Sequence, residues 1–195
     1  MSTASSGRAP IVLASGSPRR RELLEQLGLA FAIRAADIDE SVRDGEPPLD
    51  YVQRLSIEKA AAVPVPAGTL VIAADTTVDV DGVIFGKPAD ETEARSMLAA
   101  ISGRRHHVHT GVTVRLDDRS ATTVVSTAVE IAPIDEATAA WYIATGEPFD
   151  KAGGYALQGA GGVFVAGVEG SVSNVIGLPL AELVELARRV GAELL

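Results

Sequence analysis

The stretch IVLASGSPRRRELLEQL, residues 11–27, contains a complete strand–loop–helix unit. Its first four residues form a short apolar run, which is typical of a buried strand. Pro18 suits the first position of a helix, where its missing N–H costs nothing, and Ser17 before it is a natural N-cap. Leucines between positions 23 and 27 give the helix an apolar face, and Gly28 ends it. The chain therefore begins as strand, small-residue loop and helix.

Three consecutive arginines, Arg19, Arg20 and Arg21, occupy the first turn of this predicted helix. A helix N-terminus carries partial positive charge, so each cation there is unfavourable by about 0.3–1 kcal/mol. An anion held at the loop by backbone N–H groups and guanidinium forks would explain them, and phosphate is the best candidate. The alternative is that the arginines are solvated and pair locally with Glu22 and Glu25.

Length, charge and cysteine content exclude several classes of protein. The 195 residues carry 17 Lys and Arg against 26 Asp and Glu, a net charge of −9 that argues against binding to long nucleic acid. No cysteine is present, which excludes disulfides and thiolate nucleophiles. Because no apolar run reaches about 18 residues, we expect no transmembrane helix and no membrane partner. We expect a cytoplasmic protein with a disordered tail over residues 1–9 and one catalytic domain over residues 10–195.

An acidic segment follows a probable second strand over residues 31–36. Asp37, Asp39 and Glu40 place three carboxylates within four residues, and an extended chain would turn Glu40 to the opposite side from the two aspartates. Carboxylate clusters of this kind are suitable ligands for Mg²⁺ or Mn²⁺. The alternative is a solvated acidic loop.

A helix is predicted over residues 49–62, with Asp50 as its N-cap. Lys59 lies on the side of this helix that its apolar residues bury, so it can approach whatever that face contacts. The alternative is a surface lysine paired with Glu58 or Asp50.

Asp75 follows directly after a strongly apolar strand predicted over residues 69–74. An unpaired carboxylate is costly to bury there, and in α/β proteins the end of such a strand commonly faces the ligand crevice. Asp75 is therefore the best general-base or metal-ligand candidate, the alternative being an aspartate that caps a turn. Asp81-Gly82 predicts a type I′ hairpin, from which Lys87 emerges near Asp75.

The remaining elements are two helices over residues 90–101 and 135–145, a hairpin over residues 112–131, a strand over residues 162–168 and a final helix. All histidines lie at positions 106, 107 and 109. His107 and His109 share one face of a strand, as a metal pair would need, but no third zinc ligand is near, so we expect structural hydrogen bonding by His106. Trp141 is expected in the core.

Residues 146–159 are rich in glycine and charge. Their glycines, close to Asp150 and Lys151, indicate special backbone angles or close approach of the backbone to a ligand. The alternative is a mobile loop.

Motifs along nearly the whole chain resemble those of the Maf family, nucleotide pyrophosphatases also called septum formation inhibitor proteins. The opening Leu13 to Arg20 matches that family's leucine-alanine-serine-x-serine-proline-arginine-arginine throughout. The other matching segments are 37–40, 74–76, 86–88, 103–112, 150–159 and 174–180. Departures are mild: Arg105, Gly154 and Ala156 stand where the family usually has a small polar residue, alanine and glycine.

The resemblance implies hydrolysis of nucleoside triphosphates between the α- and β-phosphates, giving a monophosphate and pyrophosphate. It also implies a mixed α/β fold like that of the inosine-triphosphate pyrophosphatases, with a strongly twisted sheet, flanking helices and two lobes around a central cleft. The resemblance further implies a divalent cation, Mg²⁺ or Mn²⁺, as cofactor and often a homodimer.

Residue by residue, the resemblance makes Asp75 the proton acceptor for the attacking water or a ligand of the metal that activates it. Glu40 becomes a metal ligand or the neighbour of one. The residues placed against the triphosphate are Ser15, Arg19, Arg20, Lys59, Lys87 and Lys151. This fits the chemistry, because phosphoryl transfer mainly needs charge neutralisation and an in-line water.

Arg19, Thr76 and Gln158 resemble the subgroup that acts on dTTP and UTP, whereas the 7-methyl-GTP subgroup tends to carry tryptophan, glutamine and glutamate at those positions. Gln158 offers both a donor and an acceptor, as a uracil or thymine edge requires. We therefore expect a house-cleaning enzyme for pyrimidine triphosphates, modified ones included. The alternatives are another base preference, 7-methyl-GTP or broad, and a nucleotide-binding regulator of septum formation with incidental hydrolysis. No GxxxxGK[ST] pattern supports a P-loop enzyme.

Overall fold

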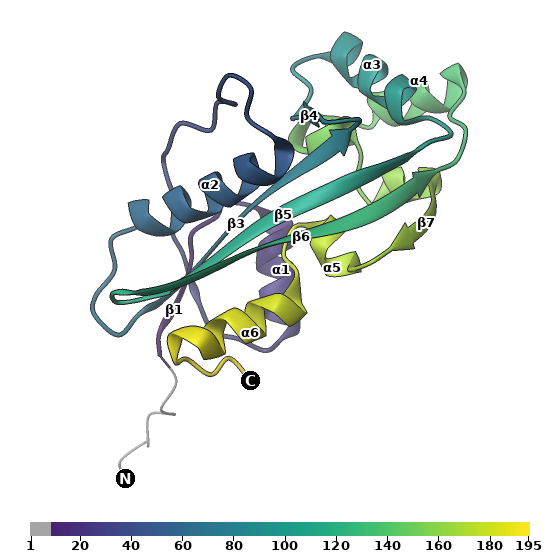
Figure 1. Ribbon diagram of the computed structural model, residues 1–195. Helices are drawn as coiled ribbons and strands as arrows, with labels where there is room; N and C mark the ends of the chain where they lie inside the picture. Colours follow the sequence, from purple (N-terminus) through teal and green to yellow (C-terminus); the bar gives the residue numbers. More distant parts are fainter. Residues whose placement is uncertain (1–8) are drawn as a thin grey trace.

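A mixed sheet forms the centre of the molecule in the computed structural model, which describes residues 9–195 (Figure 1). The predicted disordered tail therefore lies, apart from Ala9, outside the described residues. The strands are β1 (Ile11–Leu13), β2 (Ala32–Ile33), β3 (Leu70–Val80), β4 (Val83–Phe85), β5 (Arg105–Leu116), β6 (Arg119–Ile131) and β7 (Val165–Glu169). Their order is β2-β1-β3-β5-β6-β7, with β4 paired to β3. β1 runs parallel to β2 and β3, and the other pairs are antiparallel.

The helices cover both faces of this sheet. They are α1 (Pro18–Gln26), α2 (Pro48–Ala62), α3 (Glu91–Ile101), α4 (Glu136–Ala144), α5 (Val172–Ile176) and α6 (Leu180–Val190), with short 3₁₀ helices η1 (Glu147–Asp150), η2 (Ala152–Gly154) and η3 (Ala160–Phe164). In Figure 1, α2 follows β3 and β5, α6 lies near one end of the sheet, and α3 and α4 lie at the other. Of the described helices, none has the length and apolar character needed to cross a membrane.

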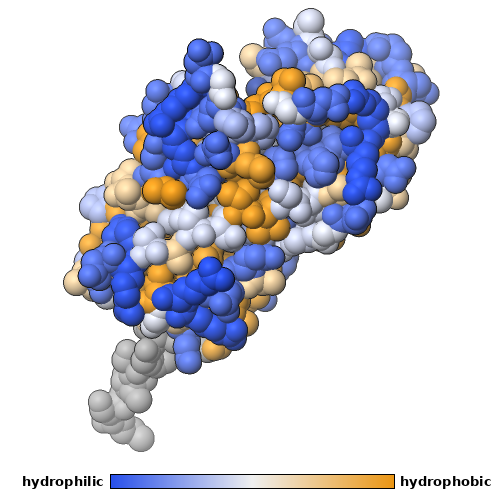
Figure 2. All heavy atoms as spheres, viewed as in Figure 1, coloured by the Kyte–Doolittle hydropathy of each residue, from blue (hydrophilic) through white to orange (hydrophobic). Residues whose placement is uncertain are grey.

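Two hydrophobic cores lie along one face of the sheet and correspond to the two predicted lobes. Side chains of β1, β3 and β5 pack against α1 and α6 in the first core, where Leu13 and Ile72 are fully buried. The far ends of β3, β5 and β6 pack against α3 and α4 in the second. A smaller cluster under α2, which includes Val71 and Ala73, covers the opposite face. The space-filling view is indented between the part that holds α2 and the part that holds α3 and α4, with hydrophobic residues at its base (Figure 2).

The opening strand–loop–helix unit is confirmed. Ile11–Leu13 form β1 and Pro18 begins α1, with Ser17 at the N-cap position. Ser17 makes no side-chain cap hydrogen bond; its own N–H instead donates to Ser15 Oγ at 3.2 Å. The Ser15 side chain therefore stabilises the loop just before the helix begins.

β3 differs from the prediction, because it continues for 11 residues where the sequence indicated an end at Ala74. β5 pairs with it from Leu70 to Asp79 and so keeps the chain extended past Asp75. On the other side of β3, β1 pairs only as far as Ile72 and β4 pairs from Val78 onward. The edge of β3 between these two neighbours is free of strand partners among the described residues, and Asp75 lies on it.

Both predicted hairpins are present. Asp81 and Gly82 have φ values of 55° and 85°, which the type I′ turn requires. The second hairpin is longer than predicted: β5 and β6 pair from Arg105 to Leu116, and the turn shortens to Asp117 and Asp118. Asp90 and Asp135 cap α3 and α4 by accepting hydrogen bonds from backbone N–H groups three residues on.

Four local predictions are wrong. Helix α2 begins one residue earlier, and Pro47, not Asp50, occupies its N-cap, because Pro48 fills the first helical position. Trp141 is 49% exposed, since α4 buries its other side against the core. The strand predicted over residues 162–168 begins only at Val165, after η3. The second strand shrinks to Ala32–Ile33, because β1 offers it only two paired positions.

Candidate active site

A cleft of about 600 Å³ lies at the free edge of β3. Every site residue predicted from the sequence lines it. They are Ser15, Arg19, Arg20, Glu40, Lys59, Asp75, Thr76, Lys87, Lys151 and Gln158. These side chains come from the β1–α1 loop with the first turn of α1, the loop before α2, α2 itself, β3, the β4–α3 loop and the glycine-rich segment. The fold therefore gathers five separate parts of the chain around β3.

Asp75 and Lys59 form a buried ion pair at the bottom of this cleft. Lys59 Nζ lies 2.6 Å from Asp75 Oδ1 and 3.0 Å from Glu40 Oε1, and Lys59 and Asp75 are 7% and 6% exposed. Lys59 therefore bridges two carboxylates and does not pair with Glu58 or Asp50, the alternative that the sequence left open. Among the described residues, no protein donor contacts the second oxygen of Asp75, Oδ2.

Close packing of α2 on the sheet brings Lys59 to this point. Gly111 of β5 faces the α2 backbone so closely that a Cβ there would lie 2.1 Å from the carbonyl oxygen of Val52. Only glycine fits such a contact. Burial raises the pKa of Asp75, and the cations of Lys59 and Arg20 offset part of that rise.

Arg20 is a buried cation that is held by neutral acceptors. Its Nε donates to the Gly177 carbonyl at 2.8 Å, Nη1 to Ser15 Oγ at 3.0 Å and Nη2 to Thr76 Oγ1 at 3.0 Å. Burial lowers the pKa of its guanidinium, while nearby Asp75 raises it. A guanidinium has five N–H donors. Within the described part of the chain, one N–H on each terminal nitrogen remains for a ligand.

Thr76 joins Arg20 to a buried hydroxyl network. Thr110 donates its single hydroxyl hydrogen to the Asn174 carbonyl at 3.0 Å. The Thr76 hydroxyl, 3.0 Å from Thr110 Oγ1 and 3.5 Å from the Gly177 carbonyl, therefore has two acceptors for its own hydrogen. Its hydrogen is committed, and its oxygen already accepts from Arg20. Toward the cleft, Thr76 offers an acceptor.

Arg19 crosses the mouth of the cleft to reach Asp150, 3.4 Å away on the glycine-rich segment. Asp150 also pairs with Lys151 at 2.5 Å, and these two cations lower the pKa of Asp150 against the effect of its partial burial. Only Arg21 follows the alternative of local pairing, with Glu25 at 3.4 Å.

Lys87 and Gln158 also line the cleft, and both are exposed. Neither has a side-chain hydrogen bond among the described residues, so both side chains are available to a ligand.

The glycine-rich segment has the special backbone angles that its composition predicted. Gly153 has φ +72°, and a Cβ there would lie 2.7 Å from a methyl group of Val78. At Gly153 the close approach is to β3. Tyr155 in this segment is buried, lines the cleft and bonds His106 Nε2 at 2.8 Å.

The acidic segment contributes one carboxylate to the cleft. Asp39 turns away and accepts from the backbone and side chain of Ser41 at 2.9 and 2.6 Å, and Asp37 is exposed outside the cleft. Glu40 alone points inward, as an extended segment predicts. Glu40 and Asp75 share one ammonium, and a pair of carboxylates suits Mg²⁺, which takes one or two carboxylates together with substrate phosphates.

A zinc site finds no support in the described residues, where no group of three or more His, Cys, Asp or Glu side chains is arranged to hold a metal. His106 makes the structural hydrogen bond that the sequence predicted. His109 bonds Ser126 at 2.7 Å and Asp79 at 3.1 Å.

Sequence reasoning did not single out every residue of the cleft, and Tyr51 and Gly177 are the examples whose contacts matter for the site. Tyr51 stands eight residues before Lys59 on α2, and that helical spacing places both on one face. This signal was readable in the sequence. Gly177 acts through its backbone carbonyl, which no residue pattern reveals.

Comparison with known proteins identifies the family of this chain. A family model described as Maf-like protein matches residues 10–190. A relative from Anaeromyxobacter sp. (strain Fw109-5), named dTTP/UTP pyrophosphatase, is 59% identical and covers 93% of this chain and 89% of its own. A Myxococcus xanthus (strain DK1622) protein of the same name is 51% identical, covering 94% of each chain. The solved Ham1 protein of Staphylococcus aureus aligns with 63% of this chain and 72% of its own at 16% identity and a TM-score of 0.45, which is too low to support an inference. The family match and the two relatives show that this chain belongs to the Maf family.

Proposed function

We propose that this protein is a nucleoside triphosphate pyrophosphatase that hydrolyses the bond between the α- and β-phosphates to give a monophosphate and pyrophosphate. The observation that carries the proposal is the buried Lys59–Asp75 pair beside Arg20, whose guanidinium keeps two N–H groups for an anion. The relatives named dTTP/UTP pyrophosphatase support the same activity.

Asp75 is the proton acceptor in this proposal. Its carboxylate lies at the free edge of β3 with Oδ1 fixed by Lys59, and Oδ2 can take a proton from the water that is added across the phosphoric anhydride. Burial favours that step, because a carboxylate with a raised pKa is a stronger base. No covalent intermediate is needed.

The basic side chains neutralise the triphosphate. Arg20 binds it as a fixed fork, and Lys59 sits next to the reacting carboxylate. Arg19, Lys87 and Lys151 provide charge at the mouth of the cleft. In a chain with net charge −9, these cations are concentrated where polyanion binding requires them.

Glu40 and Asp75 are the residues that would hold Mg²⁺ or Mn²⁺. Such a cation, when bound with the substrate, neutralises phosphate charge and favours ionisation of water. Lys59 lies between the two carboxylates and keeps them within reach of one another.

Base preference follows from hydrogen-bond chemistry at Thr76 and Gln158. Uracil and thymine present an N–H donor between two carbonyl acceptors. Thr76 offers an acceptor, because Thr110 and the Gly177 carbonyl take up its hydrogen, and the Gln158 amide offers both a donor and an acceptor. We therefore propose dTTP, UTP and modified pyrimidine triphosphates as substrates, with Arg19 as the third specificity residue. The enzyme would act in the cytoplasm, where these nucleotides are used; the homodimer stays a prediction.

Product analysis tests the proposal. Purified protein is incubated with Mg²⁺ or Mn²⁺ and a panel of dTTP, UTP, CTP, GTP, ITP and 7-methyl-GTP, and the products are separated by chromatography. Monophosphate and pyrophosphate from dTTP and UTP are expected. Turnover of purines alone would contradict the base preference. Diphosphate and phosphate as products, or binding without turnover under any metal, would contradict the proposed reaction and favour a nucleotide-binding regulator.

A further inference from the structure

The loop over residues 34–47 carries Glu40, but its own backbone does little to hold it. It contains a turn at residues 44–45 and neither a helix nor a strand, and apart from the Glu46 side chain it is exposed or half-buried. Its backbone hydrogen bonds lie near its ends, from Arg34 to Leu13 and from Glu46 to Arg43. Something else must keep Glu40 at the cleft.

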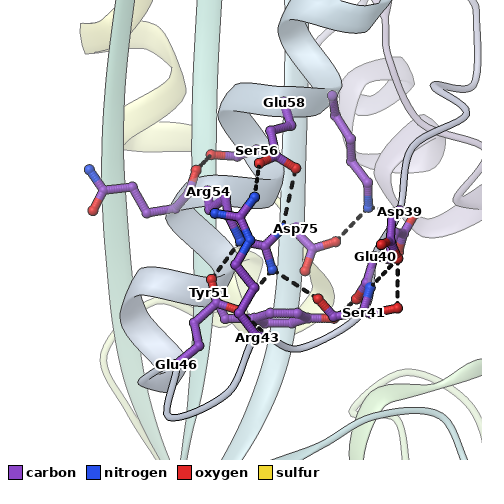
Figure 3. Close-up of polar contacts among 12 residues, drawn as sticks. Asp39, Glu40, Ser41, Arg43, Glu46, Tyr51, Arg54, Ser56, Glu58 and Asp75 are labelled. Atoms are coloured by element: carbon purple, nitrogen blue, oxygen red, sulfur yellow. Dashed lines mark hydrogen bonds and ion pairs between the residues drawn. The ribbon is translucent and has the colours of Figure 1, made fainter.

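Arg54 of α2 makes the contacts that fix this loop (Figure 3). Its Nε and Nη2 donate to the two oxygens of Glu46 at 2.5 and 2.7 Å, and Nη2 also donates to the Ser41 carbonyl at 3.0 Å. Nη1 reaches Glu58 on the next turn of α2 at 3.2 Å, and the guanidinium lies over the Tyr51 ring at 5.6 Å. The Arg54 and Glu46 side chains are only 12% and 8% exposed, so solvent screens this pair little.

Tyr51 completes the attachment. Its hydroxyl donates to the Glu40 carbonyl at 3.0 Å. Burial raises the pKa of Tyr51 to about 12, so the hydroxyl keeps its proton. The carbonyl groups of two consecutive residues, Glu40 and Ser41, are thus both tied to α2. The Glu40 carboxylate then lies 3.0 Å from Lys59 on the same helix.

We propose that Arg54 is a positioning residue that holds Glu40 in the cleft through Glu46 and the Ser41 carbonyl. Neither Arg54 nor Glu46 lines the cleft, so they can affect the reaction only through residues that do, namely Glu40 and the Tyr51 that binds its carbonyl. The consequence for hydrolysis rests on the proposed function, whereas the structural consequence for the loop does not. The role requires arginine, because one planar fork serves the carboxylate and the carbonyl together, and a lysine ammonium cannot.

The first test reads the loop in the ligand-free protein. Hydrogen exchange with millisecond labelling follows the amides of Ser41, Arg43 and Glu46, which are hydrogen-bonded inside the loop. We expect Arg54→Lys to speed their exchange about tenfold, since a charge-assisted fork is lost, while amides within α2 stay protected. Arg104→Lys is the matched control, because Arg104 pairs with Asp81 far from the cleft. Unchanged exchange in Arg54→Lys would overturn the proposal.

The second test measures whether Arg54 affects hydrolysis through Glu40. We expect Arg54→Lys to raise the Mg²⁺ concentration for half-maximal activity and to lower kcat/KM by about 10–100-fold, the range for residues that orient a ligand. Tyr51→Phe should shift the Mg²⁺ requirement in the same direction, because it loses the bond to Glu40 and keeps the ring under Arg54. In a Glu40→Gln background, Arg54→Lys should add almost nothing.

The two tests separate the possible failures. If Arg54→Lys lowers kcat/KM by the same factor in the presence and in the absence of the Glu40 carboxylate, Arg54 acts elsewhere and the proposal is overturned. If the unmodified protein hydrolyses no triphosphate, the proposed function fails, and the exchange measurement still decides whether Arg54 positions the loop.

Discussion

Asp75 combines burial, a fixed cation and a free oxygen, so its removal is the sharpest test at the scale of single residues. We expect Asp75→Asn to lower kcat by about 10²–10⁴, the usual contribution of a positioned base. Binding of the triphosphate should survive, because Arg20 and Lys59 remain. Steady-state kinetics and isothermal titration calorimetry measure the two quantities. Asp118→Asn, in the exposed β5–β6 turn, is the control and should leave both unchanged. Full activity in Asp75→Asn would remove it from the mechanism.

His106 makes stability depend on pH. Burial lowers its pKa to about 4, against an ordinary value of 6.5, so the folded protein binds its proton less readily than the unfolded chain. The contribution of neutral His106 to the free energy of unfolding is complete above about pH 6.5. It is lost as pH falls toward 4, and the total loss is about 3 kcal/mol. Urea unfolding of the native protein and of His106→Gln at pH 7.5 and 4.5 should show this loss in the native protein alone. A parallel decline of both proteins would assign it to other groups.

Arg19 and Lys59 show why residue-scale prediction succeeded in part. The arginine cluster violates the electrostatics of a helix N-terminus, and that violation correctly indicated residues that line a cleft. The partner of each cation could not be read in the same way. Lys59 had equally good local partners in Glu58 and Asp50, and only the packing of α2 on β3 and β5 selected Asp75.

Helix α2 is the element that sets the distance between Lys59 and Asp75, and Gly111 sets how closely α2 can approach. A Cβ at this position would overlap the Val52 carbonyl, so we expect Gly111→Ala to displace α2 and destabilise the protein by about 1–3 kcal/mol. Activity should fall further than stability alone explains, because Lys59 moves with the helix. Gly167→Ala is the matched control, since its Cβ would meet Glu130 at an ordinary 3.7 Å. Urea unfolding and kinetics on both variants decide the matter.

The ends of helices could be predicted where a capping side chain fixes them. The helices predicted from residues 90 and 135 begin there, because Asp90 and Asp135 cap them through hydrogen bonds that span only three residues. Strand β3 is longer than predicted, because β5 pairs with it continuously and keeps the residues after Ala74 extended, although the apolar run ends there. Cross-strand pairing is a long-range constraint, and apolar periodicity within one segment does not contain it.

At the scale of the whole molecule, the cleft is lined by Ile176, which packs against the first core, and by Val78 of the second core. A bound triphosphate should therefore stabilise the folded protein as a unit. A non-hydrolysable α,β-methylene analogue of dUTP at about 100 times its dissociation constant should add about 2.7 kcal/mol to the free energy of unfolding. Thermal unfolding with increasing analogue measures this. The corresponding GTP analogue, at the same molar concentration, is the comparison for base preference. Equal stabilisation by both would show that Thr76 and Gln158 do not select the base.

The amino-acid sequence singled out most of the charged side chains that line the cleft, and it was sufficient to predict the local units: the strand–loop–helix start, the Asp81-Gly82 turn and the helices that Asp90 and Asp135 precede. These depend on contacts between residues a few positions apart, which spacing records directly. Tertiary structure alone decided that Asp75 lies on a free strand edge, that Arg19 meets Asp150 across 131 positions, and that Arg54 holds the loop of Glu40. The physical reason is that such contacts arise from sheet register and helix packing, which bring distant residues together only after the whole chain has folded.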